Sequence, residues 1–459
     1  MNSLKDQAQP GKTLSLFDVI SIIIGIVIGS GIFKLPGMVA GNSANEWIFM
    51  ATWFAGGVMS FVGALCYAEL ASTYPNAGGD YFFIHRAFGD GMSFLFAWAR
   101  MSVIQTGCIA FLGFFLGDYL SAIFPIGSYS SGIYAIISII LLTVINIKGI
   151  AFGKWTQNLF TIMKLAGLII VIGIGVFGNP APVPEVNEHA QQSLPAFGLA
   201  MVFVLLAFGG WNESAYVSAE IKEPKKNILR SLIIGITIIT VIYILINWSY
   251  IRILGLSAMG NSRNVAQDIV RISFGIEYIP VITFFVVITV LSTMNGTILS
   301  GARGNYALGR DFKIFSVLGT WKEESGTPVT AMVVQSAISI VLVLIGMMIS
   351  IETGFETMIA YTAPVFWFFF FMAGISLFVL RKKDSAHQRV FKVPLYPLTP
   401  IIFCIICLYM LQSSISYIFL LPDIGKFSGI GAVLGICVLL LGIPLFIINK
   451  IILKKQLIS

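Results

Sequence analysis

The stretch Ile28-Gly29-Ser30-Gly31-Ile32-Phe33 breaks an apolar run that extends from about residue 16 to about residue 41. Three small residues in a row let the backbone leave a helix in the middle of a segment long enough to cross a membrane. Hydrocarbon has no water to bind the released N–H and C=O groups, so such a break is tolerated only where it lines a cavity. The stretch therefore predicts a ligand site at mid-membrane depth.

A second break of the same kind, Phe208-Gly209-Gly210-Trp211, interrupts the apolar run 195–218. Paired breaks at corresponding positions in two halves of a chain are the best sequence indication of a transporter's substrate site. We therefore expect a secondary transporter whose site lies between its first and sixth membrane spans.

The composition fixes the fold class. Of the 459 residues, 57% are hydrophobic and only 11% are charged, which is typical of a polytopic membrane protein. Runs of about 20 apolar residues predict an all-α protein with twelve transmembrane helices. The runs lie near 16–41, 47–72, 92–120, 131–148, 154–177, 195–218, 229–254, 279–303, 328–349, 355–380, 396–420 and 428–449.

The positions of the two breaks also predict an internal repeat. Spans one to five and six to ten have opposite orientations, because five is odd, and each half begins with a broken span. We expect a single transporter domain over 1–459, with a first repeat at 14–177, an inverted second repeat at 195–380 and two additional helices at 396–449.

The net charge of +7 follows the predicted topology and does not indicate a nucleic-acid partner. With the N-terminus inside, most of the 28 Lys and Arg residues fall in inner loops, as the positive-inside rule requires. The outer loops hold only Lys34, Arg252, Arg263, Arg271 and Lys426. We expect a multi-pass protein of the cell (plasma) membrane, embedded in the lipid bilayer, with both termini in the cytoplasm.

No cofactor or metal is expected. All five cysteines lie in apolar stretches, and Cys404 and Cys407 have the spacing of a metal-binding pair but no second pair of ligands. The three histidines, His85, His189 and His387, fall in separate predicted loops. No constellation typical of an enzyme active site is present either.

The first break offers groups for both poles of an α-amino acid. The N–H groups of Gly29, Ser30 and Gly31, with the N-terminus of the following half-helix Ile32–Ala40, attract a carboxylate. The carbonyl groups of Val27 and Ile28 lose their helical partners and can accept hydrogen bonds from an ammonium group. Taken alone, the glycines also fit close helix packing, since Gly25 and Gly29 have the spacing of a helix-pairing motif.

The second break adds to this interpretation. It releases further carbonyl groups near Gly209, and Leu206 or Phe208 can close over a bound substrate. We expect Trp211 to pack against neighbouring helices instead.

Several motifs in order resemble the amino acid–polyamine–organocation superfamily, and within it the L-type amino acid transporters. They are IGSGIF (28–33), PNAGGDY (75–81), FGGWN (208–212), EIKEPKKNI (220–228), SGAR (300–303) with RD (310–311), and FKVP (391–394). The resemblance implies a twelve-helix fold with a five-plus-five inverted repeat. It also implies that the backbone of Gly29, Ser30 and Gly31 binds the substrate carboxylate, and that carbonyl groups near Val27, Phe208 and Gly209 bind the amine.

One departure from the family's animal members concerns a partner protein. Those members are linked to a single-span heavy subunit by a cysteine between spans three and four, and residues 121–130 contain no cysteine. We expect a free-standing subunit of the prokaryotic kind.

Lys164 is the most informative single residue. It follows Lys154, at the inner end of the fifth predicted span, by ten residues, which places it about 15 Å into the membrane. An ammonium group at that depth costs about 2.5–3.5 kcal/mol and usually serves a function. In sodium-coupled relatives a cation binds between the first and eighth spans, where Ser292 and Thr293 would lie here. Our hypothesis is that the Lys164 ammonium replaces that sodium ion; the alternative is a snorkelling or structural lysine.

Three further charged residues have weaker assignments. We expect Arg100 to reach the cytoplasmic headgroups, Glu213 to pair with a neighbour or cap a half-helix, and Glu69 to be a solvated or paired end of its span.

The expected substrate is a neutral L-amino acid, because no acid or base other than Glu213 and Lys164 lies near the breaks. With a lysine in place of sodium, sodium-independent exchange by alternating access is the expected mode. The alternatives are a proton-coupled amino acid symporter, using Lys164 or Glu213, and an antiporter for cationic amino acids or polyamines.

Overall fold

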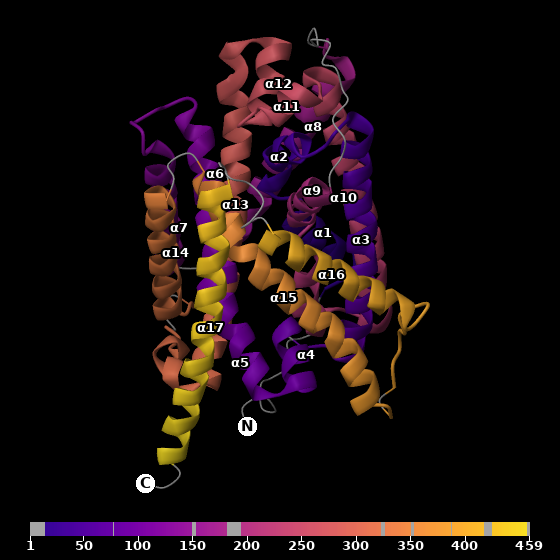
Figure 1. The fold of residues 1–459 in the computed structure, drawn as a ribbon, viewed down its shortest axis with the longest axis vertical. Helices are drawn as coiled ribbons and strands as arrows, with labels where there is room; N and C mark the ends of the chain where they lie inside the picture. The colour runs from indigo at the N-terminus through magenta and orange to yellow at the C-terminus, as the bar shows by residue number, and fades with distance from the viewer. Residues whose placement is uncertain are drawn as a thin grey trace.

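A computed structural model describes residues 14–76, 78–148, 153–180, 194–322, 326–349, 353–386, 388–416 and 425–456. In this part of the chain the secondary structure is helical apart from two isolated β-bridges. Most helices run along the long axis of one bundle, with α11 and α12 at one end and α4 and α5 near the other (Figure 1).

The helical elements follow the predicted apolar runs. In chain order they are α1 (Leu16–Val27), η1 (Ser30–Phe33), α2 (Leu35–Gly41), α3 (Glu46–Thr73), α4 (Gly79–Phe88), α5 (Asp90–Ala99), η2 (Arg100–Ile104), α6 (Gln105–Ser121), α7 (Ser130–Lys148), α8 (Gly153–Phe177), α9 (Leu194–Ala207), η4 (Trp211–Glu220), α10 (Pro224–Leu254), α11 (Leu256–Gly260), α12 (Val265–Phe274), η5 (Ile276–Tyr278), α13 (Ile279–Asp311), η6 (Lys313–Gly319), α14 (Val329–Ile349), α15 (Gly354–Lys383), α16 (Leu398–Ser416) and α17 (Gly425–Gln456).

Ten helices of the described chain are long and apolar enough to cross a membrane. Two shorter apolar helices, Leu16–Val27 and Met163–Phe177, lie within the first and fifth predicted spans. The all-helical, multi-pass architecture is therefore confirmed. The count of twelve and the inverted repeat remain predictions.

The first span is broken where the glycines predict. Its helix α1 begins at a capping box, in which the Ser15 side chain accepts a hydrogen bond from the Asp18 amide and the Asp18 carboxylate accepts one from the Ser15 amide. The helix ends at Val27, and Gly29 has an extended backbone, with φ −102° and ψ −161°.

The outer half of the first span differs from the single half-helix predicted over Ile32–Ala40. It consists of the 3₁₀ turn η1 followed by α2, with Lys34 between them. Pro36 explains the division, because its ring has no N–H group and clashes with the carbonyl group four residues earlier in a continuous helix.

The sixth span is broken at the predicted position too. The helix α9 ends at Ala207, and Gly210 adopts φ +105°, a left-handed conformation that glycine reaches without steric cost. The chain continues as the ten-residue 3₁₀ helix η4. This run is unusually long, because 3₁₀ helices rarely exceed three or four residues.

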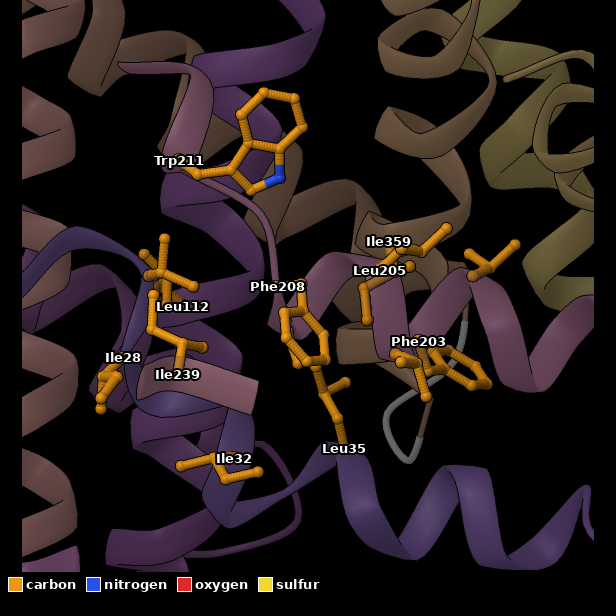
Figure 2. Close-up of a cluster of buried hydrophobic side chains, with 14 of the residues drawn as sticks. Ile28, Ile32, Leu35, Leu112, Phe203, Leu205, Phe208, Trp211, Ile239 and Ile359 are labelled. Carbon is orange, nitrogen blue, oxygen red and sulfur yellow. The ribbon is translucent and has the colours of Figure 1, made fainter. Parts of the chain in front are cut away.

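The two breaks pack directly against each other's spans. A Cβ atom at Gly31 would lie 3.6 Å from the Cα atom of Ala207, and one at Gly210 would lie 2.7 Å from Cγ2 of Ile26. A side chain at position 210 would therefore have to displace the Ile26 side chain, and the φ of +105° disfavours any residue other than glycine. Figure 2 shows the buried apolar side chains around the breaks, among them Ile28 and Ile32 from the first span and Phe208 from the sixth.

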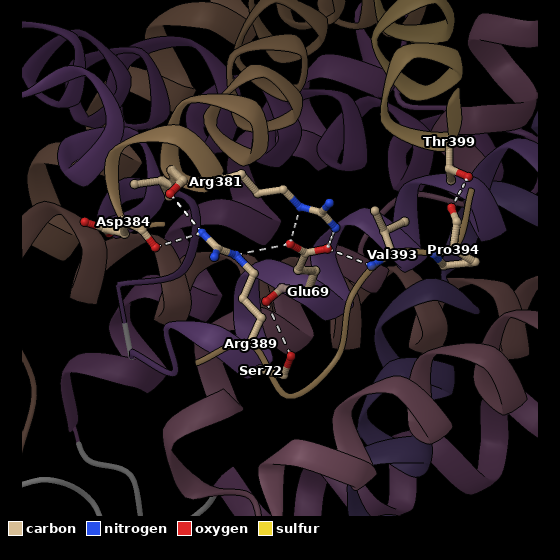
Figure 3. A network of polar contacts seen from close by, with 9 residues as sticks. Glu69, Ser72, Arg381, Asp384, Arg389, Val393, Pro394 and Thr399 are labelled. Atoms are coloured by element: carbon tan, nitrogen blue, oxygen red, sulfur yellow. Dashed lines mark hydrogen bonds and ion pairs between the residues drawn. The ribbon is translucent and has the colours of Figure 1, made fainter. Parts of the chain in front are cut away.

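At the end of α3, Glu69 is fully paired and is not solvated. Its carboxylate accepts hydrogen bonds of 2.7 Å from Nε of Arg381 and from the amide of Val393, and Arg389 lies 3.5 Å away (Figure 3). Its side chain is 1% exposed. The cluster joins α3 to the end of α15 and to the segment that follows it.

Candidate functional site

A cavity of about 420 Å³ lies where the two broken spans meet α6, α8, α13 and α15. Its volume is in the range of small-molecule sites. Each break contributes to the wall: Gly29, Ser30 and Gly31 from the first span, and Gly209 and Gly210 from the sixth.

All but two of the residues predicted to form the site line this one cavity. Besides the glycines and Ser30, these residues are Val27, Lys164, Leu206, Ser292 and Thr293. The structure therefore brings together residues from four separate membrane segments.

The two exceptions are Ile28 and Phe208, which are buried in the protein and do not line the cavity. The Phe208 ring packs against Tyr243 and Trp53, with centroid distances of 5.0 and 6.4 Å. Gly56 on α3 allows this approach, since a Cβ atom there would lie 3.3 Å from the Phe208 ring. In this conformation Phe208 does not cover the cavity as predicted, whereas Leu206 faces it.

Several backbone groups at the breaks have no hydrogen-bond partner in the described part of the chain. They are the N–H groups of Ser30 and Gly31 and the carbonyl groups of Ile28, Phe208 and Gly209. The N–H group of Gly29 is occupied, because it donates to the Val27 carbonyl at 2.6 Å. The first break therefore has unpaired N–H groups, at Ser30 and Gly31, and an unpaired carbonyl group at Ile28. The second break has only unpaired carbonyl groups among these residues.

Tyr243 on α10 is a site residue that the sequence did not reveal. Its hydroxyl group lies 2.8 Å from the carbonyl oxygen of Val27 and 3.0 Å from that of Ala207, so it reaches the last residue of both α1 and α9. The Val27 carbonyl, predicted to be open to an amine, already accepts hydrogen bonds from Tyr243 and Gly29. These two bonds occupy the Val27 carbonyl in this conformation, and its role in binding the amine stays a prediction.

Lys164 connects α8 to the broken first span. Its ammonium group donates a 2.8 Å hydrogen bond to the carbonyl oxygen of Gly25, and its side chain is 2% exposed. This position does not fit the snorkelling alternative.

The α13 residues assigned to coupling lie close to the same break. A Cβ atom at Gly29 would be 3.6 Å from Oγ1 of Thr293, whose hydroxyl donates to the Thr289 carbonyl. The neighbouring Ser292 hydroxyl is buried and has no partner in the described structure.

Arg100 forms an internal ion pair and does not reach the headgroups, so the sequence-based expectation for it was wrong. One guanidinium nitrogen lies 3.4 Å from each carboxylate oxygen of Glu213, and the other donates a 2.7 Å hydrogen bond to the Tyr216 hydroxyl. Arg100 starts the π-helical turn η2, a feature often found at functional sites. Glu213 pairs with a neighbour, as expected.

Comparison with known proteins identifies the family. A family model described as "Amino acid permease" matches residues 14–443. The chain belongs to this family. The permease is thus a member of the superfamily that its motifs resemble.

Three relatives match most of the permease. It is 29% identical to the serine/threonine exchanger SteT of Bacillus subtilis (strain 168) over 395 residues, which cover 85% of this chain and 88% of the relative. It is 29% identical to the b(0,+)-type amino acid transporter 1 of Mus musculus over 416 residues (88% and 82%). It is 30% identical to the large neutral amino acids transporter small subunit 2 of Homo sapiens over 453 residues (95% and 80%). These proteins are amino acid transporters and not enzymes, and the permease shares that general function.

Proposed function

We propose that this permease exchanges neutral L-amino acids across the cell membrane, independently of sodium, by alternating access between the repeats 14–177 and 195–380. The proposal rests on one observation: the unpaired N–H groups of Ser30 and Gly31 and the unpaired carbonyl group of Gly209 adjoin one cavity. The amides of Ser30 and Gly31 bind the substrate carboxylate. The carbonyl group of Gly209 binds its ammonium group.

The charges of the cavity wall favour a neutral substrate. Glu213 is the one acid among the described lining residues, and Arg100 faces it at 3.4 Å. A second cation, as in arginine or a polyamine, would have to compete with Arg100 for this carboxylate. The names of the relatives, a serine/threonine exchanger and a large neutral amino acid transporter subunit, agree with this choice.

Lys164 supports sodium-independent exchange. Its fixed ammonium group holds the first span at Gly25, and Ser292 and Thr293 lie in the wall of the same cavity. We assign to this ammonium the role that a sodium ion has in coupled relatives. Because no ion gradient is consumed, exchange of one amino acid for another is the mode that we propose. Proton symport through Lys164 or Glu213 is the competing mechanism.

We propose further that the permease works without a heavy subunit. Residues 121–130, between α6 and α7, contain no cysteine that could form the link found in animal members. The distribution of Lys and Arg residues supports a cytoplasmic position for both termini.

The decisive experiment uses the purified chain in proteoliposomes loaded with radiolabelled amino acid. Efflux should require an unlabelled neutral amino acid outside, and it should be independent of sodium and of a pH gradient. A competition panel of all common amino acids then defines the substrates. Strong efflux into plain buffer, or uptake driven by a proton gradient alone, would contradict exchange, and inhibition only by arginine, lysine or polyamines would contradict a neutral substrate.

A further inference from the structure

The cavity wall contains a side-chain carboxamide, that of Gln105, without a hydrogen-bond partner in the described structure. Gln105 is the first residue of α6, directly after the π-helical turn η2, and it is 7% exposed. In the described structure its side-chain amide forms no hydrogen bond, although Gln105 lines the cavity. A ligand that enters the cavity can therefore form hydrogen bonds with this amide.

The other polar side chains of the wall already have partners or lie at the breaks. Thr293 and Thr297 bond to carbonyl groups of their own helix, and Thr362 does the same on α15. Asn212 donates to Asp80, and Glu213 faces Arg100. Of the unpaired hydroxyls, Ser30 belongs to the first break and Ser292 to the α13 wall beside it. Gln105 has no hydrogen-bond partner in the described structure and does not lie at either break.

The location of Gln105 fits a contact with the substrate side chain. Residues of α6 and α15 line the same cavity as the two breaks, so the side chain of a zwitterion held at the breaks can reach these walls. Gln105, Cys108 and Leu112 are three and four residues apart, so they share the face of α6 that lines the cavity. Around them the wall is largely apolar and includes Ile104, Phe111, Ile359, Phe366 and Trp367.

We propose that Gln105 determines specificity, so that the permease selects neutral amino acids with a hydroxyl or carboxamide side chain over aliphatic ones of similar size. This inference rests on the proposed function. A carboxamide both donates and accepts, and it therefore pairs with the side chains of serine, threonine, asparagine and glutamine. An aliphatic side chain leaves the amide unpaired, and sites built around a hydrogen bond discriminate strongly against ligands that lack one.

The test compares wild type and Gln105→Met, which keeps the length of the side chain and removes the amide. In proteoliposome exchange, the ratio of kcat/KM for serine or glutamine to kcat/KM for leucine should fall about 10-fold or more, while leucine exchange is retained. Cys437→Ala, at an exposed position on α17 outside the cavity wall, is the control and should leave the ratio unchanged. An unchanged ratio in Gln105→Met, or an equal loss for all substrates, would overturn the proposal.

A second variant provides a test in case Gln105→Met does not fold. Gln105→Asn keeps the amide and withdraws it by one methylene, so serine exchange should decrease more than glutamine exchange. Equal decreases would count against the proposal. Failure of the proposed function is distinguishable, because the wild-type permease would then exchange no neutral amino acid at all.

Discussion

The hydroxyl group of Tyr243 lies 2.8 Å from the carbonyl oxygen of Val27, at the end of the inner half of the first span. It lies 3.0 Å from the Ala207 carbonyl at the end of α9 as well, so one side chain of α10 reaches both broken spans. A phenol has a single hydrogen, and it can satisfy only one of these carbonyl groups at a time. Tyr243 therefore links the two breaks without fully satisfying either.

Replacing Tyr243 by phenylalanine should lower stability and slow exchange. The substitution leaves two buried carbonyl groups without this donor, at a cost of about 1–3 kcal/mol. We expect a lower Tm in detergent and an exchange rate reduced about 10-fold. The control is Tyr250→Phe on the same helix, because the buried Tyr250 hydroxyl has no partner in the described structure. Equal effects of the two substitutions would argue against a specific role for Tyr243.

Lys164→Ala should impair exchange more than it impairs folding. It removes the ammonium group that holds the Gly25 carbonyl at 2.8 Å, and the first span is then free to adopt other positions. We expect exchange to fall at least 10-fold and the affinity ratio between the two membrane faces to change. Lys148→Ala, at an exposed position on α7, should change neither quantity. Unchanged transport and an unchanged affinity ratio in Lys164→Ala would remove the proposed role.

Arg100 and Glu213 should behave as an energetically coupled pair. Glutamine at either position leaves a partly buried charge without its partner, and glutamine at both positions removes the mismatch. A double-mutant cycle on Tm and exchange rate should give a coupling energy of about 0.5–3 kcal/mol, with the double variant less affected than the sum of the single ones. Purely additive effects would show that the 3.4 Å contact contributes nothing.

Asp80 on α4 predicts a pH dependence of stability. Burial raises the pKa of its carboxyl to about 6, and the carboxylate accepts long contacts of 3.4 Å from Asn212 and Tyr216. The folded protein therefore favours protonated Asp80. Its contribution to the free energy of unfolding is complete below about pH 4 and is lost as the pH rises through about 6.

The variant Asp80→Asn tests this sign. Wild-type Tm in detergent should decrease between pH 5 and pH 8, and the decrease should be smaller in Asp80→Asn by an amount equivalent to about 1–3 kcal/mol. Glu277→Gln, at an exposed position, should keep the wild-type profile. A profile of Asp80→Asn identical to wild type would assign the pH dependence to other groups.

The parts of the site that the sequence predicts depend on local chemistry. The breaks at residues 28–31 and 208–210 follow from consecutive glycines in apolar runs, where unpaired backbone needs a cavity. The depth of Lys164 follows from the rise of a helix. Neither inference requires knowledge of which helices are neighbours.

The parts that the sequence misses depend on contacts between distant segments. Tyr243 lies 216 residues from Val27, and within its apolar run a tyrosine is indistinguishable from an aromatic core residue. The direction of Phe208 depends on Gly56 in another helix. Arg100 contacts Glu213, which lies 113 residues away in the sequence. It does so from a π-helical turn that no local sequence pattern predicts.

Glu69 has a consequence for biogenesis. Its partners Arg381 and Val393 follow it by 312 and 324 residues, so the ribosome has completed most of the chain before this acid is neutralised. An uncompensated buried charge costs several kcal/mol. In nascent or truncated chains that end before residue 381, Glu69 therefore lacks its partners, and translation of the end of α15 and of the segment that follows supplies them.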